Sequence, residues 1–81
     1  MHVVVLQPPY PTAATPTAAT DCLAWQERHL AGLAAQDVDF VLLPEYANAP
    51  GLEGTDLAAF AREPGARFAA GLAAEARRLQ A

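Results

Sequence analysis

The sequence predicts an α/β fold, because two uninterrupted apolar runs are separated by a segment with the periodicity of a helix. Residues 3–6 and 40–43 lack polar alternation, as is typical of parallel strands that are buried on both faces. Between the runs, Leu23, Leu30 and Ala34 recur at helical spacing on one face. A helix of this length between two strands is typical of a β-α-β unit, so we expect the strands to be parallel.

A loop and then a helix follow the first strand. Residues 8–19 are rich in proline, threonine and alanine and show no apolar periodicity, which indicates a loop. We expect the helix to cover residues 21–35, with Thr20 as the N-cap, because its hydroxyl can accept a hydrogen bond from a free backbone N–H of the first turn.

The second strand has a carboxylate directly beyond its end. Pro44 has no backbone N–H to give to a sheet, so we expect it to end the strand of residues 39–43. Glu45 then follows just past the C-terminal end of the strand. Ligands bind at this edge in open α/β sheets, which makes Glu45 the first candidate for a functional residue.

Two further helices are predicted in the second half of the chain. Proline and glycine punctuate residues 46–54, so we expect a loop there. Thr55 and Asp56 can cap a short helix that ends at Phe60 or Arg62. A Pro-Gly pair separates it from a last helix, from about residue 66, that we expect to cover the sheet. The apolar stripe of this last helix consists of Phe68, Leu72, Ala76 and Leu79.

Composition and charge exclude several classes of protein. The 81 residues include nine acidic residues and five arginines, a net charge of −4, and therefore no basic surface for nucleic acid or an anionic membrane. A single cysteine, Cys22, rules out an internal disulfide. No segment has the apolar length of a signal-peptide core or a membrane span, so we expect a protein of the cytoplasm.

The predicted core is incomplete. Two strands that are each buried on both faces cannot be covered by one another and by two or three helices, since stable sheets generally have three or more strands. We therefore expect residues 1–81 to be the N-terminal piece of a larger α/β domain.

These elements, in this order, resemble the opening of the carbon–nitrogen hydrolase (nitrilase-like) superfamily. The specific part of the resemblance is the sequence Asp-Phe-Val-Leu-Leu-Pro-Glu-Tyr at residues 39–46, supported by a first strand that ends in Gln7. The resemblance implies that residues 1–81 form the N-terminal β-α-β-α portion of a four-layer α-β-β-α sandwich, truncated within a single hydrolase domain. It implies no cofactor and no metal.

The resemblance also implies a reaction, in which a glutamate, a lysine and a cysteine act together on a small amide, nitrile or carbamoyl compound. Glu45 would be the general base that takes the proton from the cysteine thiol before the sulfur attacks the substrate. From the residues alone, a solvated carboxylate at a strand end is the simpler interpretation of Glu45.

The chain departs from this pattern in three ways. It has no lysine, and Cys22 is not the nucleophile because it lies in the first helix. Asp37 stands where the family often has glycine. The resemblance therefore implies a fragment that does not turn over substrate alone, and whose full-length parent can be a homo-oligomer.

Other candidate residues have two interpretations each. Tyr10 and Tyr46 follow the two strands, and they either line a substrate pocket or pack within turns. Cys22, Trp25 and His29 are close enough in sequence to share a helix face. They lack the further ligands of a closed metal site, so we expect Cys22 to pack inward with the two rings at its margin.

Two other functions remain open. Residues 3–11 also look like the start of a cobalamin-binding domain, but the chain lacks the Asp-x-His-x-x-Gly pattern of that domain, and Leu-Pro-Glu is left unexplained. Alternatively, the chain is a truncated paralogue without catalytic activity that is capable of pairing with another chain.

Overall fold

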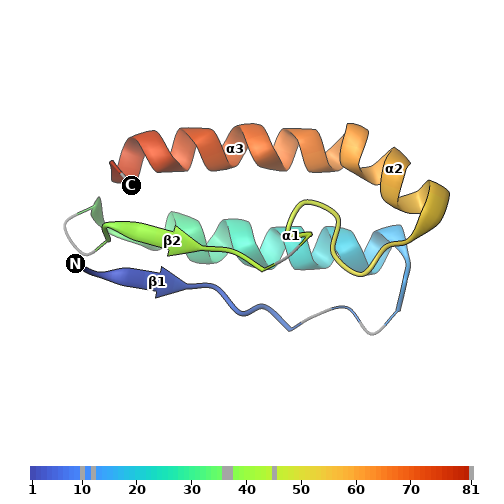
Figure 1. Cartoon of the computed structure of the whole chain (residues 1–81), viewed down its shortest axis with the longest axis horizontal. Coiled ribbons are helices and arrows are strands. Elements are labelled where there is room, and N and C mark those ends of the chain that lie inside the picture. The colour runs from blue at the N-terminus through green and yellow to red at the C-terminus, as the bar shows by residue number, and fades with distance from the viewer. Residues whose placement is uncertain (10, 12, 36–37, 45, 81) are drawn as a thin grey trace.

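The computed structural model describes residues 1–9, 11, 13–35, 38–44 and 46–80, and it confirms the α/β class. Five elements follow one another along these described residues (Figure 1). None of the described helices has the length and hydropathy needed to cross a membrane. The elements are the strand β1 (Val3–Val5), the helix α1 (Pro16–Ala31), the strand β2 (Phe40–Leu42), the helix α2 (Gly54–Arg62) and the helix α3 (Pro64–Leu79).

The two strands pair in parallel, as the β-α-β pattern predicts. Val3 lies opposite Phe40, and Val5 lies opposite Leu42. The pairing continues one residue further, because the backbone N–H of Leu6 donates to the carbonyl oxygen of Leu42 at 2.9 Å. Both strands therefore end at the same edge of the sheet.

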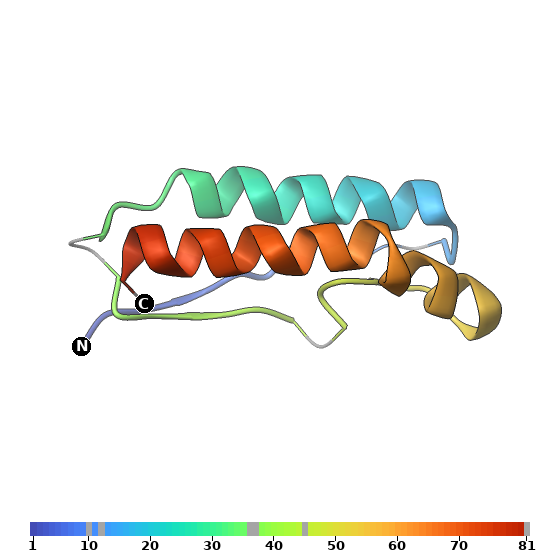
Figure 2. The ribbon, with the colours of Figure 1, turned by 90° about the horizontal axis from the view of Figure 1, so that it is seen from above.

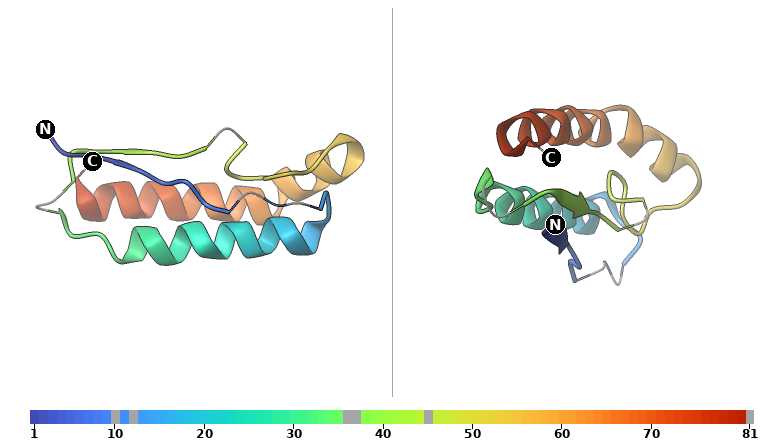
Figure 3. Two further views of the ribbon diagram at one scale, coloured as in Figure 1. Left: turned by 90° about the horizontal axis from the view of Figure 1, so that it is seen from below. Right: turned by 60° about the vertical axis from the view of Figure 1, so that its left-hand side comes forward.

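The long helices cover only one side of this sheet. Helices α1 and α3 lie side by side, and both strands run along one side of the pair (Figures 2 and 3). The prediction of strands buried on both faces is therefore wrong for the described chain, since side chains alternate between the two faces of a strand. We call the uncovered side the outer face; it is formed by Val3, Val5, Phe40 and Leu42, each about half exposed.

Helix α1 begins at Pro16, earlier than the sequence pattern predicts. Thr15, and not Thr20, is the N-cap, and its hydroxyl accepts a hydrogen bond from the backbone N–H of Ala18 at 3.2 Å. Proline suits the first helical position because its missing N–H would have no partner there and its φ is already helical. Part of the predicted loop is therefore helix.

Helix α1 also ends earlier than predicted, at Ala31. The guanidinium group of Arg78, in α3, donates to the carbonyl oxygens of Leu30 and Leu33, both at 3.0 Å. These bonds satisfy carbonyl groups that further helical turns would otherwise have used. The predicted turn at residues 36–37 lies outside the described residues.

Helices α2 and α3 follow each other without a loop. Helix α2 ends at Arg62, as predicted, but it begins at Gly54 without a side-chain cap, so the predicted cap at residues 55–56 is wrong. Helix α3 begins with the Pro-Gly pair itself, at Pro64. Gly65 allows close packing there, because a Cβ on it would lie 2.7 Å from a backbone carbonyl oxygen of the loop after β2.

The core lies between the three helices and the loop that follows β2. The predicted stripe of α3 is buried at Phe68 and Leu79 and half-buried at Leu72. Ala76, by contrast, is exposed, so the stripe is only partly buried. Ala76, Leu72 and Leu79 border a cavity of about 220 Å³ across which α3 faces β2. The buried cluster consists of Ala19, Leu23, Ala49, Leu52, Phe60 and Phe68.

Candidate functional site

The candidate site lies at the edge of the sheet where both strands end. Because the strands are parallel, the segments that follow β1 and β2 leave the sheet at the same edge. Pro44 is half-buried and Tyr46 begins a turn. Glu45, the predicted general base, and Tyr10, a predicted pocket residue, lie outside the described residues. The structure thus places the residues on both sides of position 45, and the role of Glu45 stays a prediction.

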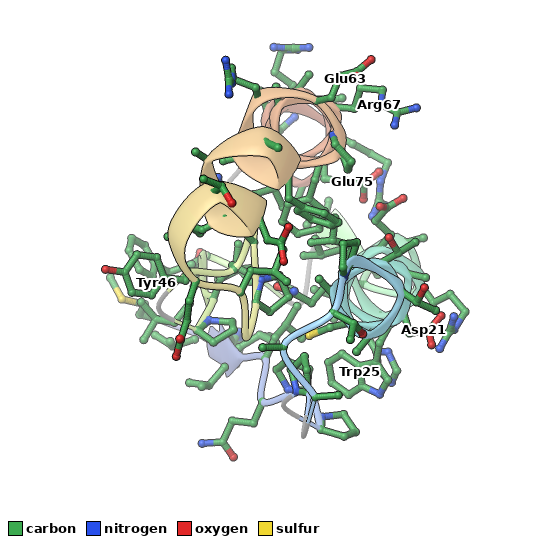
Figure 4. All side chains as sticks on the ribbon, turned by 90° about the vertical axis from the view of Figure 1, so that its right-hand side faces the viewer. Asp21, Trp25, Tyr46, Glu63, Arg67 and Glu75 are labelled. Carbon is green, nitrogen blue, oxygen red and sulfur yellow. The ribbon has the colours of Figure 1, made fainter. Side chains whose placement is uncertain are left out.

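Tyr46 is exposed at this edge. Its φ of 56° lies in the left-handed region, and its carbonyl oxygen accepts a hydrogen bond from the backbone N–H of Ala49 at 3.0 Å, which closes a tight turn. Tyr46 is 61 % exposed, and its ring points away from α1 and α3 (Figure 4). It borders a shallow surface hollow together with Leu52, Glu53 and Leu57. An exposed ring at a strand edge suits contact with a ligand, and the substrate contact of Tyr46 stays a prediction.

The loops that follow the two strands touch each other beside this turn. Gly51 has a φ of 76°, and a Cβ on it would lie 3.0 Å from the Cβ of Pro11. A side chain at residue 51 would therefore be strained and would push the two loops apart. The close approach joins the segment after β1 and the segment after β2 into one structure, which we call the rim: residue 11 and residues 46–53.

A buried glutamine holds the rim on helix α1. Gln26 has no exposed surface, and its Nε2 donates to the carbonyl oxygen of Ala47 at 3.1 Å. Its Oε1 has no hydrogen-bond partner in the part of the chain that the structure describes. Burying an unbonded amide is unfavourable, so the bond to Ala47 is a strong constraint on the loop.

Sequence reasoning did not single out Gln26, although a signal was present. Gln26 follows Leu23 by three residues and precedes Leu30 by four, which places it on the apolar face of the helix. A polar side chain at such a position is buried and needs a partner. The partner, Ala47, lies two residues after Glu45 in the chain.

Cys22 is buried beside Gln26 and borders a surface hollow together with Pro11, a residue of the rim. Burial raises the pKa of its thiol, and the weak hydrogen bond from Nε2 of Gln26, at 3.8 Å, lowers it in part. The thiolate is the nucleophilic form of cysteine, and a raised pKa keeps the thiol protonated. These properties are those of a packing residue.

Trp25 and His29 form a stacked pair on helix α1. Their ring centroids are 3.8 Å apart with an angle of 19° between the planes, and Nδ1–H of His29 donates to the carbonyl oxygen of Trp25 at 2.8 Å. Cys22 is buried and His29 is exposed, so the predicted packing of these three residues is confirmed. Within the described ranges, no three His, Cys, Asp or Glu side chains are grouped so that they could hold a metal ion.

The described residues define a small α/β fold with two parallel strands and three helices, in which the two strand ends meet at one rim. The chain has no lysine, and its one cysteine is buried in α1, so the 81 residues do not provide a complete Glu-Lys-Cys set. Comparison with protein-family models, with curated proteins and with solved structures finds no match to the chain. A functional assignment therefore depends on the residues themselves.

Proposed function

We propose that the chain is the N-terminal part of a hydrolase that cleaves non-peptide carbon–nitrogen bonds in a small amide, nitrile or carbamoyl compound. One observation carries this proposal. The strands β1 and β2 are parallel and end at one edge, and the Leu-Pro-Glu sequence begins directly after β2. Functional groups in open α/β folds lie past the C-terminal ends of such strands, which is the position of Glu45 in the chain.

In the proposed reaction, Glu45 takes the proton from a cysteine thiol. With an amide or carbamoyl substrate, the sulfur attacks the carbonyl carbon, Glu45 passes the proton to the nitrogen, and the nitrogen leaves as ammonia or an amine. With a nitrile, the sulfur adds to the carbon to give a thioimidate, and water adds to the thioimidate before ammonia leaves. In both cases water then hydrolyses the acyl-enzyme to the acid and the free thiol. A lysine stabilises the negative charge of the tetrahedral intermediate. Because these 81 residues contain no lysine, and their one cysteine is buried with a raised pKa, we propose that the remainder of a longer parent supplies both the lysine and the nucleophilic cysteine.

The proposal includes a finer architecture, in which residues 1–81 are the N-terminal β-α-β-α portion of a four-layer α-β-β-α sandwich. Such a sandwich has a second sheet packed on the first. Two features support it: α1 and α3 form a helical layer on one side of the sheet, and the outer face is apolar and half exposed.

The test is the release of ammonia from a panel of small amides, nitriles and carbamoyl compounds by the protein that the complete reading frame encodes. Glu45→Gln keeps the size of the side chain but removes the base, so kcat/KM should fall by about 10²–10⁴-fold. Glu27→Gln is the matched control, because Glu27 is exposed on helix α1 and lies outside the rim. A reading frame without a lysine and a second cysteine would contradict the proposal, as would full activity of Glu45→Gln.

A second candidate function, a pairing module without catalytic activity, is favoured by the half-exposed outer face. It predicts that the 81-residue chain associates with another chain whether or not any hydrolase activity is found.

A further inference from the structure

One edge of strand β2 carries backbone groups that face away from β1. The sheet of the described residues has the order β1-β2, so the far edge of β2 pairs with no described strand. The N–H of Phe40 donates to the carbonyl oxygen of His2, and the carbonyl oxygen of Leu42 accepts from the N–H of Leu6, so these two residues of β2 direct their backbone groups toward β1. Backbone groups alternate between the two edges along a strand, so the N–H and C=O of Val41 point to the far edge, which we call the free edge of β2.

Helix α3 presents apolar side chains to the space beside the free edge. A cavity of about 220 Å³ lies between α3 and β2. It is bordered by apolar side chains of both segments: Val41, Leu43, Leu72, Ala76 and Leu79. Ala76 is exposed although it belongs to the apolar stripe of α3. The carboxylate of Glu75 also borders the cavity, but it is paired with Arg78 at 2.7 Å. The cavity therefore suits apolar side chains and needs no charged partner.

Helix α3 ends where the strands begin. In Figure 1, α3 runs beyond β2, on the side away from β1, and its last turn lies beside the starts of both strands; the view from above agrees (Figure 2). Gln80, the C-cap of α3, has a φ of 59°, in the left-handed region that commonly ends a helix and turns the backbone. A segment that leaves this turn is placed to run alongside β2 in the same direction.

The handedness of crossovers selects the free edge of β2 over the outer edge of β1. Helices α1 and α3 lie on the same side of the sheet (Figures 2 and 3). Crossovers between parallel strands are right-handed in about 98 % of cases, so two successive crossovers on one side of a sheet move in the same direction. The crossover through α1 leads from β1 to β2. A crossover through α3 therefore leads from β2 to the position beyond it, beneath α3.

We propose that the free edge of β2 binds a third parallel strand, which in the longer parent is the segment that follows α3. The N–H and C=O of Val41 gain hydrogen-bond partners in this strand, and its inward side chains fill the cavity beneath α3. These inward side chains are apolar, because a charge in the cavity would lose its hydration without gaining a partner. The strand adds to the edge of the sheet and leaves the outer face as it is.

The inference rests on the longer parent of the proposed function, but on neither Glu45 nor a substrate. An inactive parent with a protected Val41 amide would contradict the hydrolase alone. An active parent in which the Val41 amide exchanges freely would contradict the third strand alone.

Hydrogen exchange measured by NMR tests the proposal in the complete protein and in a chain that stops about 15 residues after α3, enough for a short connection and a strand. We expect the Val41 amide to exchange at least about tenfold more slowly in both proteins than in the 81-residue chain, because a hydrogen bond within the sheet protects it. The amides of Val3 and Val5 are the internal control in the shortened chain, since the bond from Leu6 to β2 places them on the opposite edge of β1.

Several results would overturn the proposal. One is a Val41 amide that exchanges as fast in the complete protein as in the 81-residue chain. Another is protection of Val3 and Val5 in place of Val41 in the shortened chain, which would put the strand beside β1. A third is protection of Val41 in the 81-residue chain that grows with concentration, because a second copy would then occupy the edge. A reading frame that ends at residue 81 would overturn it as well.

Two lysine substitutions in α3 test the cavity in the complete protein, and this comparison holds even if the 81-residue chain does not fold alone. Ala76→Lys places a charge against the third strand and should lower the midpoint of urea unfolding by about 1 M or more. Ala70→Lys adds the same charge at an exposed position of α3 that does not border the cavity, and should shift the midpoint by less than about 0.2 M. Equal midpoints for the two variants would show that no strand lies beneath Ala76.

Discussion

The two sides of the sheet differ in whether their apolar side chains have partners. On the helical side, Phe68 is 4 % exposed, because three helices and the loop after β2 close around it. On the outer face, Phe40 is 52 % exposed although it lies in the middle of the sequence and within a strand. The comparison shows that an apolar residue is buried only where other elements of the fold pack over it. The strands thus pack against the helices on one side and leave the apolar side chains of the other side exposed to solvent.

The sharpest test of this difference compares Phe68→Ala with Phe40→Ala in monomeric protein. We expect Phe68→Ala to lower the free energy of unfolding by about 3–5 kcal/mol, because it removes a buried ring and leaves a cavity. Phe40→Ala should lower it by less than about 1.5 kcal/mol, because half of that ring is already in water. Urea unfolding followed by circular dichroism measures both. Equal losses would mean that the outer face is covered even in the monomer.

A second test concerns the polar contact that connects the packed side to the rim. Gln26→Ala removes the donor to the carbonyl oxygen of Ala47 and leaves a small cavity, so we expect a loss of about 2 kcal/mol in the free energy of unfolding. Gln7→Ala is the matched control, since Gln7 is exposed, and should change this free energy by less than about 0.5 kcal/mol. Hydrogen exchange of the rim amides should also become faster in Gln26→Ala but not in Gln7→Ala. Unchanged exchange there would show that Gln26 does not hold the loop.

The smallest expected effect is a pH dependence that originates on the packed side. Because burial raises the pKa of the Cys22 thiol, the folded chain holds this proton to a higher pH than the unfolded chain does. The contribution to stability is complete below the unfolded thiol's pKa of about 8.5 and is lost as the pH rises through the higher folded pKa. The free energy of unfolding of the native chain should therefore fall more steeply than that of Cys22→Ala between about pH 8 and pH 10. Parallel profiles would show that the thiol is not desolvated.

Local patterns predict much of the fold but not the start of α1. The apolar runs identify both strands, and a helix between them requires parallel pairing, as observed. Thr15 and Thr20 are both capable N-caps, and Pro16 between them looks like a loop residue. Packing decides in favour of Thr15, because Ala19 is fully buried in the core and has its place there only if the helix begins before it.

Burial and the site depend on contacts that local patterns do not contain. An unalternated apolar run shows that both faces of a strand are apolar, but not whether another element covers each face, which is why the outer face is predicted wrongly. Gln26 can be recognised by its helical position, whereas its bond to Ala47 joins residues 21 positions apart. Glu45 is a candidate through its place after β2 and through a resemblance to known hydrolases.

The loop after β2 is held on α1 by the buried side chain of Gln26, so its position can be changed by a substitution in the interior of the protein. Exchanging Gln26 for asparagine shortens the side chain by one carbon–carbon bond, about 1.5 Å, and would draw Ala47 toward the helix axis. Such a change would reposition the carbonyl group of Ala47 while every strand residue stayed native. A substitution inside helix α1 would then change the position of the loop after β2 without any substitution in the loop or the sheet.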